Sequence, residues 1–353
     1  MDHKKELQDL IETVIREDGS DIHISEGRHP TIRVASFLVP LVKKPILSKE
    51  DVKGIFNVLL NDGHKEIFKE KQEADFAYAY EDKARFRGSV YTQQGMISIA
   101  LRLIPKKIRT FEELNLPPIL NNFAERQQGF FMVVGPTGQG KSTTLAAIVE
   151  LINQTRLEHI ITIEDPIEYV FEQKKSIIDQ REVKSDTPNF HLALRGVFRQ
   201  DVDVVMIGEM REPETISTAV TAAETGHFVL STLHTNTAAQ TIDRVIDSFP
   251  AAQQNQIRLQ LAGSLIGIFS QRLIPRISGG LVPAYELLIA NNAVANLIRE
   301  GRSHEINTVI ETSSEEGMID LNRSIAELVR QGEITVENAY RFSVNQKTLE
   351  KLI

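Results

Sequence analysis

Residues 135–142 read GPTGQGKS, and their types and spacing suit the binding of phosphate groups. Gly135, Gly140, Lys141 and Ser142 occupy the required positions of a phosphate-binding loop. In such a loop the glycines let backbone N–H groups wrap a β-phosphate, the lysine reaches the β- and γ-phosphates, and the serine hydroxyl binds Mg²⁺. The loop follows the apolar run FFMVV and precedes the helical stretch STTLAAIVELI, as this motif requires.

We therefore expect ATP and Mg²⁺ to bind here, because a chance glycine-rich turn, the alternative, would not combine pattern and context. The amino terminus of the following helix adds favourable partial charge for a phosphate. The residues expected to contact the nucleotide are Gly135, Pro136, Thr137, Gly138, Gln139, Gly140, Lys141, Ser142 and Thr143.

Two glutamates end apolar runs that resemble buried strands. Glu164 ends HIITIE, after which Pro166 directs the chain out of the sheet, and Glu209 follows VVMIG. Ligands bind at the carboxyl ends of parallel strands, so either carboxylate can orient the attacking water in phosphoryl transfer. With Gly208 where many nucleotide hydrolases have aspartate, Mg²⁺ would rely on Ser142, phosphate oxygens and waters held by the two glutamates. The alternatives are that Glu164 only caps a turn and that Glu209 only ends a core strand.

Two histidines flank the apolar run FVLSTL. His234 lies in the polar loop STLHTNT, just past the carboxyl end of the expected strand. From there it can reach a γ-phosphate and respond to its hydrolysis. His227 precedes the strand and is expected to be structural, and a structural hydrogen bond is also the alternative for His234.

Five arginines are candidates for contact with a phosphate. Arg195 and Arg199 are four residues apart and are expected on one face of a helix. Arg85 and Arg87 share one face of an expected strand, and Arg102 lies one strand later. Exposed arginines are usually solvated charges. In a multi-subunit nucleotide hydrolase, however, arginines that cannot reach their own phosphate loop are candidates for an arginine finger across an interface.

The elements that position these residues fall into two expected domains. Residues 1–104 begin with a helical pattern of leucine, isoleucine and valine and continue with alternating strands such as SDIHIS, FAYAY and ISIALRL. This is typical of a small α+β domain with a half-exposed sheet. Residues 105–118, PKKIRTFEELNLPP, contain three prolines and no sustained period, and we interpret them as an interdomain linker.

The second domain is expected over residues 119–290, where short apolar strands alternate with helical stretches. This pattern indicates an α/β fold with a parallel sheet that is covered on both faces. Residues 291–353 are expected to form a helical region, in which Met318, Leu321 and Ile325 share one helix face.

Composition limits the classes of partner. The net charge of −8 argues mildly against a nucleic-acid translocase, since binding to a phosphate backbone requires a basic surface. The chain has no cysteine, which excludes disulfides and thiolate chemistry and makes a reducing cytoplasm plausible. The amino terminus lacks the apolar core of a signal peptide, and no run of about 18 apolar residues occurs. Any membrane association is therefore expected to use a partner rather than direct insertion.

Several motifs together resemble one family, the secretion ATPases of the type II and type IV pilus superfamily, and within it the pilus retraction ATPases. The phosphate loop is followed by stretches similar to the family's aspartate box, Walker B strand and histidine box. In this order they are ITIEDPIEYVF (161–171), RQDVDVVMIGEMRE (199–212) and GHFVLSTLHTNTAAQTIDRVIDSFP (226–250). The early SDIHIS and the late AVANL are also similar, so the resemblance covers nearly the whole chain.

The resemblance implies a PAS-like amino-terminal domain, a RecA-like ATPase domain and a homohexameric ring with ATP between subunits. It further implies a location on the inner face of the cytoplasmic membrane, where the ring drives an inner-membrane platform protein that withdraws pilin. The Gly-Glu strand end is normal in this family, and the position that matches Glu209 is essential for turnover. A paralogous pilus ATPase is a further expected partner.

Three positions depart from the family pattern. Gln139 replaces a usual serine, a change expected to be harmless because this position contributes mainly backbone. Val202 replaces a usual proline, and Ala295 replaces the arginine of the retraction motif. Ala295 leaves open an accessory role beside another motor. The length of 353 residues and the absence of cysteine favour a retraction ATPase over the longer extension and type II secretion ATPases, which often carry a four-cysteine zinc site.

Overall fold

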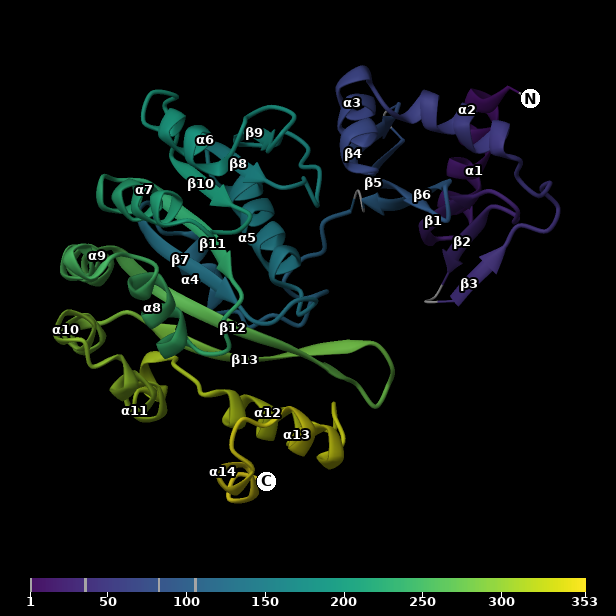
Figure 1. Ribbon diagram of the computed structural model, residues 1–353. Helices are drawn as coiled ribbons and strands as arrows, with labels where there is room; N and C mark the ends of the chain where they lie inside the picture. Colours follow the sequence, from purple (N-terminus) through teal and green to yellow (C-terminus); the bar gives the residue numbers. More distant parts are fainter. Residues whose placement is uncertain (1, 35–36, 82, 105–106) are drawn as a thin grey trace. The chain divides into compact units, whose positions relative to one another are not determined.

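The computed structural model describes residues 2–34, 37–81, 83–104 and 107–353. By its internal contacts the chain divides into two compact units (Figure 1). The first comprises residues 1–107 with the short segment 168–170, and the second comprises residues 108–167 and 171–353. The predicted linker, 105–118, stays a prediction, and its residues 105 and 106 lie outside the described residues.

The first unit is an antiparallel sheet with helices. The sheet order is β3 (Phe37–Pro40), β2 (Thr31–Val34), β1 (Gly19–Ser25), β6 (Met96–Ile104), β5 (Ala84–Gln93) and β4 (Glu73–Tyr80). The helices are α1 (His3–Arg16), α2 (Lys49–Leu59) and α3 (Asp62–Lys71). The side chain of Asp2 accepts the N–H groups of Lys4 and Lys5 and so caps α1. Apolar residues of α1 and α2 pack with one face of the sheet and form the core of this unit.

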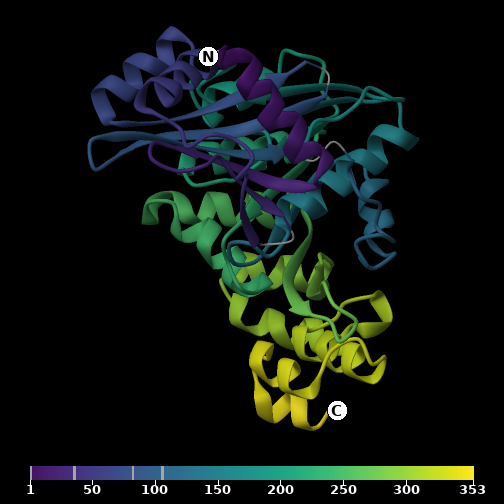
Figure 2. The same cartoon turned by 90° about the vertical axis from the view of Figure 1, so that its right-hand side faces the viewer.

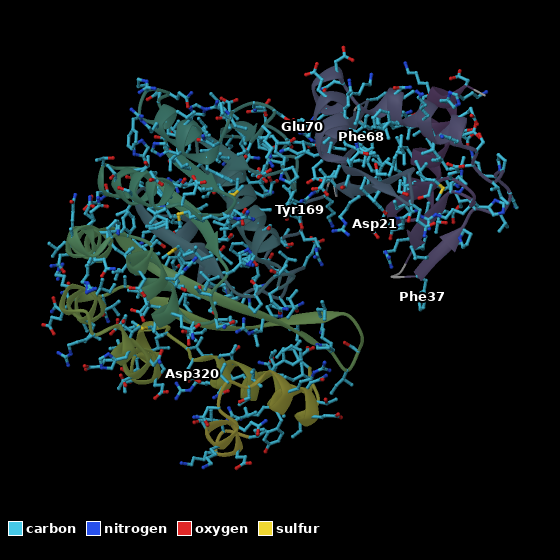
Figure 3. All side chains as sticks on the ribbon, in the orientation of Figure 1. Asp21, Phe37, Phe68, Glu70, Tyr169 and Asp320 are labelled. Atoms are coloured by element: carbon cyan, nitrogen blue, oxygen red, sulfur yellow. The ribbon has the colours of Figure 1, made fainter. Side chains whose placement is uncertain are left out.

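Four charged side chains line up across the other face of this sheet. The strand register places Arg33, Asp21, Arg102 and Arg87 opposite one another on β2, β1, β6 and β5. Asp21, labelled in Figure 3, accepts a hydrogen bond from Arg102 at 2.9 Å and lies 3.7 Å from the Nε of Arg33. One buried carboxylate therefore compensates part of an arginine-rich row.

The second unit is built on a seven-stranded sheet. Its order is β13 (Leu281–Ile289), β12 (Leu265–Pro275), β7 (Gly129–Val134), β11 (Phe228–Leu233), β10 (Val204–Ile207), β8 (His159–Glu164) and β9 (Ile177–Glu182). The pairs from β12 to β9 are parallel, and only β13 joins as the antiparallel arm of a hairpin. The central strands are buried apolar runs, so the predicted α/β fold class is confirmed.

Helices alternate with these strands along the chain. They are α4 (Leu120–Ala124), α5 (Lys141–Thr155), α6 (Phe190–Val197), α7 (Pro213–Glu224), α8 (Ala238–Asp247) and α9 (Ala251–Ser264). The register aligns Val134 with Leu233, and Ile207 with both Ser231 and Ile163. The phosphate loop, the loop after β11 and the acidic ends of β10 and β8 therefore lie along one edge of the sheet.

Residues 292–350 contain the helices α10 (Asn292–Glu300), α11 (Ile306–Thr312), α12 (Leu321–Arg330), α13 (Val336–Phe342) and α14 (Gln346–Glu350), with short 3₁₀ turns at Ser303–Glu305 and Ser314–Glu316. The expectation that Met318 lies on the same helix as Leu321 is wrong. Asp320 accepts the N–H of Arg323 and starts α12 one turn later, while the neighbouring Ile319 bridges to β13.

Figures 1 and 2 show α12–α14, drawn in yellow, beside the β12–β13 hairpin. Ile274, Val282 and Ala284 of the hairpin share a small core with Leu321 and Ile325. No helix within the described residues is both long enough and apolar enough to cross a membrane.

Candidate functional site

The phosphate loop connects β7 to α5 and has the backbone shape that anion binding needs. Gly138 and Gly140 both have φ near +77°, in the left-handed region that favours glycine. A Cβ at Gly135 would lie 2.5 Å from the backbone oxygen of Gln271, so this glycine allows the loop to pack against β12. The sequence thus uses glycine where a side chain would either strain or displace the loop.

Lys141 is buried at the first position of α5 and lies inside the loop. Its Nζ donates to the backbone oxygen of Pro136 at 2.9 Å, and it lies 3.4 Å from Nδ1 of His234. The hydroxyl of Thr137 is also 3.4 Å from that nitrogen. The structure therefore brings the predicted lysine and histidine together, although 93 residues separate them.

Glu209 lies on the far side of His234. Its Oε2 is 3.8 Å from Nε2 of His234, and its Oε1 is paired at 2.5 Å with Arg211. The Glu209 side chain is only 18% exposed, whereas Arg211 is 77% exposed. His234 thus stands between the loop lysine and the carboxylate at the end of β10.

Burial lowers the pKa of His234, and the positive charges of Lys141 and Arg211 lower it further, while Glu209 opposes the shift. The geometry and the charges therefore favour a neutral imidazole, which can donate one hydrogen bond and accept another.

Glu164 is more buried than Glu209 and is held differently. Its Oε1 accepts a hydrogen bond from the hydroxyl of Thr162 at 2.7 Å and another from the side-chain amide of Gln180 at 3.2 Å. Only 6% of Glu164 is exposed. This carboxylate is fixed by neighbours on β8 and β9.

The geometry gives a reason for Gly208. A Cβ at this position would lie 3.5 Å from Cα and 3.8 Å from Cγ of Glu164. An aspartate here would therefore bring a second carboxylate beside the buried Glu164. With glycine at 208, it is Glu164 of the neighbouring strand β8 that borders the space next to Glu209.

The loop that follows His234 is anchored to the β12–β13 hairpin. Asn236 accepts hydrogen bonds from Ser270 to its backbone oxygen and from Arg272 to its side chain, both at 2.8 Å. Glu286 accepts the N–H of Ala238 at 2.7 Å. Burial raises the pKa of Glu286 to about 7, since the nearby Arg272 offsets only part of the cost of desolvation. Sequence patterns do not predict these anchors, because the anchors join segments far apart in the chain.

His227 contacts its neighbours in the fold, and the expectation that its role is structural stays a prediction. Its Nδ1 lies 3.0 Å from the backbone oxygen of Ala222, and its ring meets Phe198 edge to face.

The predicted arginines are distributed over both units of the chain. The expectation that Arg195 and Arg199 share a helix face is wrong, because α6 ends at Val197 and Arg199 lies in the following turn. Both side chains are exposed. Arg85, Arg87 and Arg102 belong to the sheet of the first unit. A role for any of the five in binding a phosphate stays a prediction.

Gln139 corrects a further expectation, that its position contributes mainly backbone. Its side-chain oxygen accepts the backbone N–H of Leu273 at 2.7 Å, and its backbone oxygen accepts the side-chain amide of Gln271 at 2.9 Å. Gln271 is buried and also accepts the hydroxyl of Thr144 at 2.7 Å. Sequence reasoning missed Gln271 because its partners are more than 120 positions away.

The residues present fit a nucleotide with a divalent cation. A buried ammonium and a glycine-shaped backbone suit a phosphate, and the partly exposed Ser142 directly follows Lys141. Within the described ranges, no group of three or more histidine and acidic side chains is arranged to hold a metal alone. A cation here would depend on Ser142 together with phosphate oxygens and water.

Comparisons with known proteins agree with this geometry. The sequence profile of the Type II/IV secretion system protein family matches residues 3–280. The chain is 42% identical to the type IV pilus retraction ATPase PilT of Pseudomonas aeruginosa, over 95% of this chain and 97% of that protein. It is 38% identical to the type IV pilus ATPase PilU of the same organism, over 99% of this chain and 91% of that protein. The crystal structure of the pilus retraction motor PilT with bound ADP superposes with a TM-score of 0.91 and 43% identity, over 97% of this chain and 98% of the other.

Proposed function

The chain belongs to the Type II/IV secretion system protein family, and we propose that it is an ATP-hydrolysing motor that powers retraction of a type IV pilus. The similarity to the retraction ATPase along nearly the whole of both chains carries this proposal. It is supported by a phosphate loop, a histidine beside the loop lysine and two carboxylates at one edge of a parallel sheet.

The site suggests a division of roles. Lys141 and the backbone of residues 138–141 hold the phosphates of ATP, and Ser142 offers its hydroxyl to Mg²⁺, which would neutralise charge on the phosphates. Glu209 orients the attacking water, because it is the carboxylate that faces His234, which in turn lies beside Lys141. Glu164 is the fixed acid beside it and holds water on the cation. His234 contacts the terminal phosphate and senses its loss.

The working assembly is a homohexamer in which neighbouring subunits complete each other's sites. Arginines that are exposed on the chain, such as Arg87 and Arg195, are suited to act on a neighbour's nucleotide. The ring acts at the inner face of the cytoplasmic membrane on a platform protein of the pilus machine. Movement of the subunits during turnover is passed to that partner.

Three measurements test the proposal. Purified protein should hydrolyse ATP with Mg²⁺, and Lys141→Ala should weaken nucleotide binding. Deletion of the gene in its host should leave too many surface pili and abolish twitching. A host that loses its pili instead would identify an extension motor, and one with unchanged pili and motility would contradict the proposal.

An accessory role beside a second pilus ATPase is the other candidate, because the similarity to PilU covers almost the whole chain. Ala295, where the resemblance implies an arginine, lies half-buried on α10 against the core and offers no charge to a partner. Nucleotide binding without turnover, in protein indistinguishable from a Glu209→Ala variant, would favour this role.

A further inference from the structure

Strand β12 extends beyond the end of its pairing with β7. Past that point, the side chain of Gln139 forms a hydrogen bond with β12. β7 pairs with β12 from Leu265 to Ser270, and the chain of β7 then turns into the phosphate loop. Three residues later on β12, the N–H of Leu273 donates to Oε1 of Gln139 at 2.7 Å. Leu273 lies beyond Ser270, the last residue of β12 that pairs with β7, so β7 offers its N–H no acceptor. A loop side chain thus satisfies a strand N–H that would otherwise need another partner.

The contact between loop and strand is reciprocal. Gln271, only 3% exposed, donates from its side chain to the backbone oxygen of Gln139 at 2.9 Å. Its side-chain oxygen accepts the hydroxyl of Thr144, in the first turn of α5, at 2.7 Å. Hydrogen bonds therefore tie both the loop and the start of its helix to one stretch of β12. We call Gln139, Thr144, Gln271 and Leu273 the loop–hairpin clasp.

The clasp lies directly beside the core of the C-terminal helices. Ile274, the residue after Leu273, is fully buried together with Val282 of β13 and with Leu321 and Ile325 of α12. Side chains alternate along a strand, so the side chains of Leu273 and Ile274 lie on opposite faces of β12. A shift of the loop that moves Leu273 therefore also moves a residue on which α12 packs.

We propose that Gln139 is a positioning residue that couples the phosphate loop to the β12–β13 hairpin and to the helices packed on it. This inference rests on the proposed function in one respect, that a nucleotide binds at the loop. A phosphate held by the loop backbone favours one arrangement of the loop, and that arrangement is the one in which Gln139 meets Leu273. Nucleotide binding then stabilises the hairpin, because only a ligand with different affinities for two arrangements shifts their populations.

Hydrogen exchange of the full-length chain, with and without ADP and Mg²⁺, tests the coupling. In the wild type, ADP should slow exchange both in residues 135–144 and in the hairpin residues 271–283. Gln139→Ser has too short a side chain to reach Leu273, so ADP should still protect the loop but should protect the hairpin less than in the wild type, where Gln271 is not the only link. Loss of one hydrogen bond should also weaken ADP binding roughly 2- to 10-fold. The control Gln128→Ser, at an exposed loop position before β7, should behave as the wild type.

A conservative variant separates coupling from affinity. Gln139→Glu keeps an oxygen that can accept from Leu273 but adds a negative charge beside the phosphates, so it should bind ADP more weakly and still protect the hairpin at saturating ADP. Hairpin protection that is equal in Gln139→Ser and the wild type would overturn the proposal, as would a wild-type hairpin that does not respond while the loop does. If the wild type bound no ADP at all, the proposed function itself would fail.

Discussion

The two acidic strand ends of the second unit look alike in sequence and differ in what surrounds them. Glu164 at the end of β8 is buried and accepts hydrogen bonds from the neutral side chains of Thr162 and Gln180. Glu209 after β10 is paired with the exposed Arg211 and faces His234. Glu164 is therefore fixed by side chains of the sheet, whereas Glu209 is held by an arginine that is exposed to solvent.

This difference in surroundings suggests a structural role for Glu164 and a catalytic role for Glu209. A carboxylate fixed by neutral donors on the sheet keeps its place at little cost in reorganisation, but it has less freedom to follow a reacting water. An exposed ion pair contributes at most about 1 kcal/mol, so Glu209 can exchange Arg211 for a water or a phosphate-bound group. We therefore expect Glu209 to dominate turnover and Glu164 to dominate stability.

The largest effect should follow replacement of the acid at the end of β10. Glu209→Gln should lower the rate of ATP hydrolysis by about 10²–10³-fold, as loss of one preorganised electrostatic group does. Nucleotide binding should be retained, since Lys141 and the loop are unchanged. Steady-state hydrolysis and ADP titration measure the two quantities.

Glu212→Gln, an exposed acid in the same loop, is the matched control and should hydrolyse ATP at the wild-type rate. Wild-type turnover by Glu209→Gln would show that the assignment of roles to the two strand ends is wrong.

The second effect concerns folding. Glu164→Ala should lower the free energy of unfolding by about 1–3 kcal/mol, because the buried hydroxyl of Thr162 loses its acceptor, whereas Glu209→Ala should change it by less than about 1 kcal/mol. Urea denaturation of both variants measures this contrast. Glu164→Gln keeps an oxygen for the hydroxyl of Thr162 and should lose less than the alanine variant. If both alanine variants lost the same free energy of unfolding, Glu164 would not contribute more to stability than Glu209 and the distinction between the two strand ends would be wrong.

Local pattern was enough to predict much of this site. The apolar runs that end at Glu164, Ile207 and Leu233 are continuous, and parallel strands bring their carboxyl ends to one edge. The approach of His234 to Lys141 follows from that rule without any knowledge of side-chain contacts. The family resemblance was also predicted from motif order, and the profile match confirms it.

What the sequence could not predict depends on packing between distant segments. Gln271 and Gln180 meet their partners across strands, and nothing at their own positions marks them as site residues. The end of α6 before Arg199 was missed because helical spacing alone does not locate a terminus. The role of Gln139 was misjudged because a phosphate loop is usually considered as backbone, whereas here a strand N–H lies within reach of the side chain.

A third carboxylate sharpens the comparison, because Glu286 is buried like Glu164 but shows a single neutral donor, the N–H of Ala238. Its folded-state pKa of about 7 lies above the ordinary 4.5, since burial and the charge of Asp320 outweigh Arg272. The stability that the protonated group contributes is therefore full below pH 4.5 and is lost as the pH rises through 7.

Glu286→Gln keeps the oxygen that Ala238 needs and does not ionise. Relative to the wild type it should be more stable at pH 8, by on the order of 3 kcal/mol, and nearly equal at pH 4.5. Denaturation of both proteins across this range measures the difference, and a difference independent of pH would mean that Glu286, like Glu164, is held well enough to stay charged.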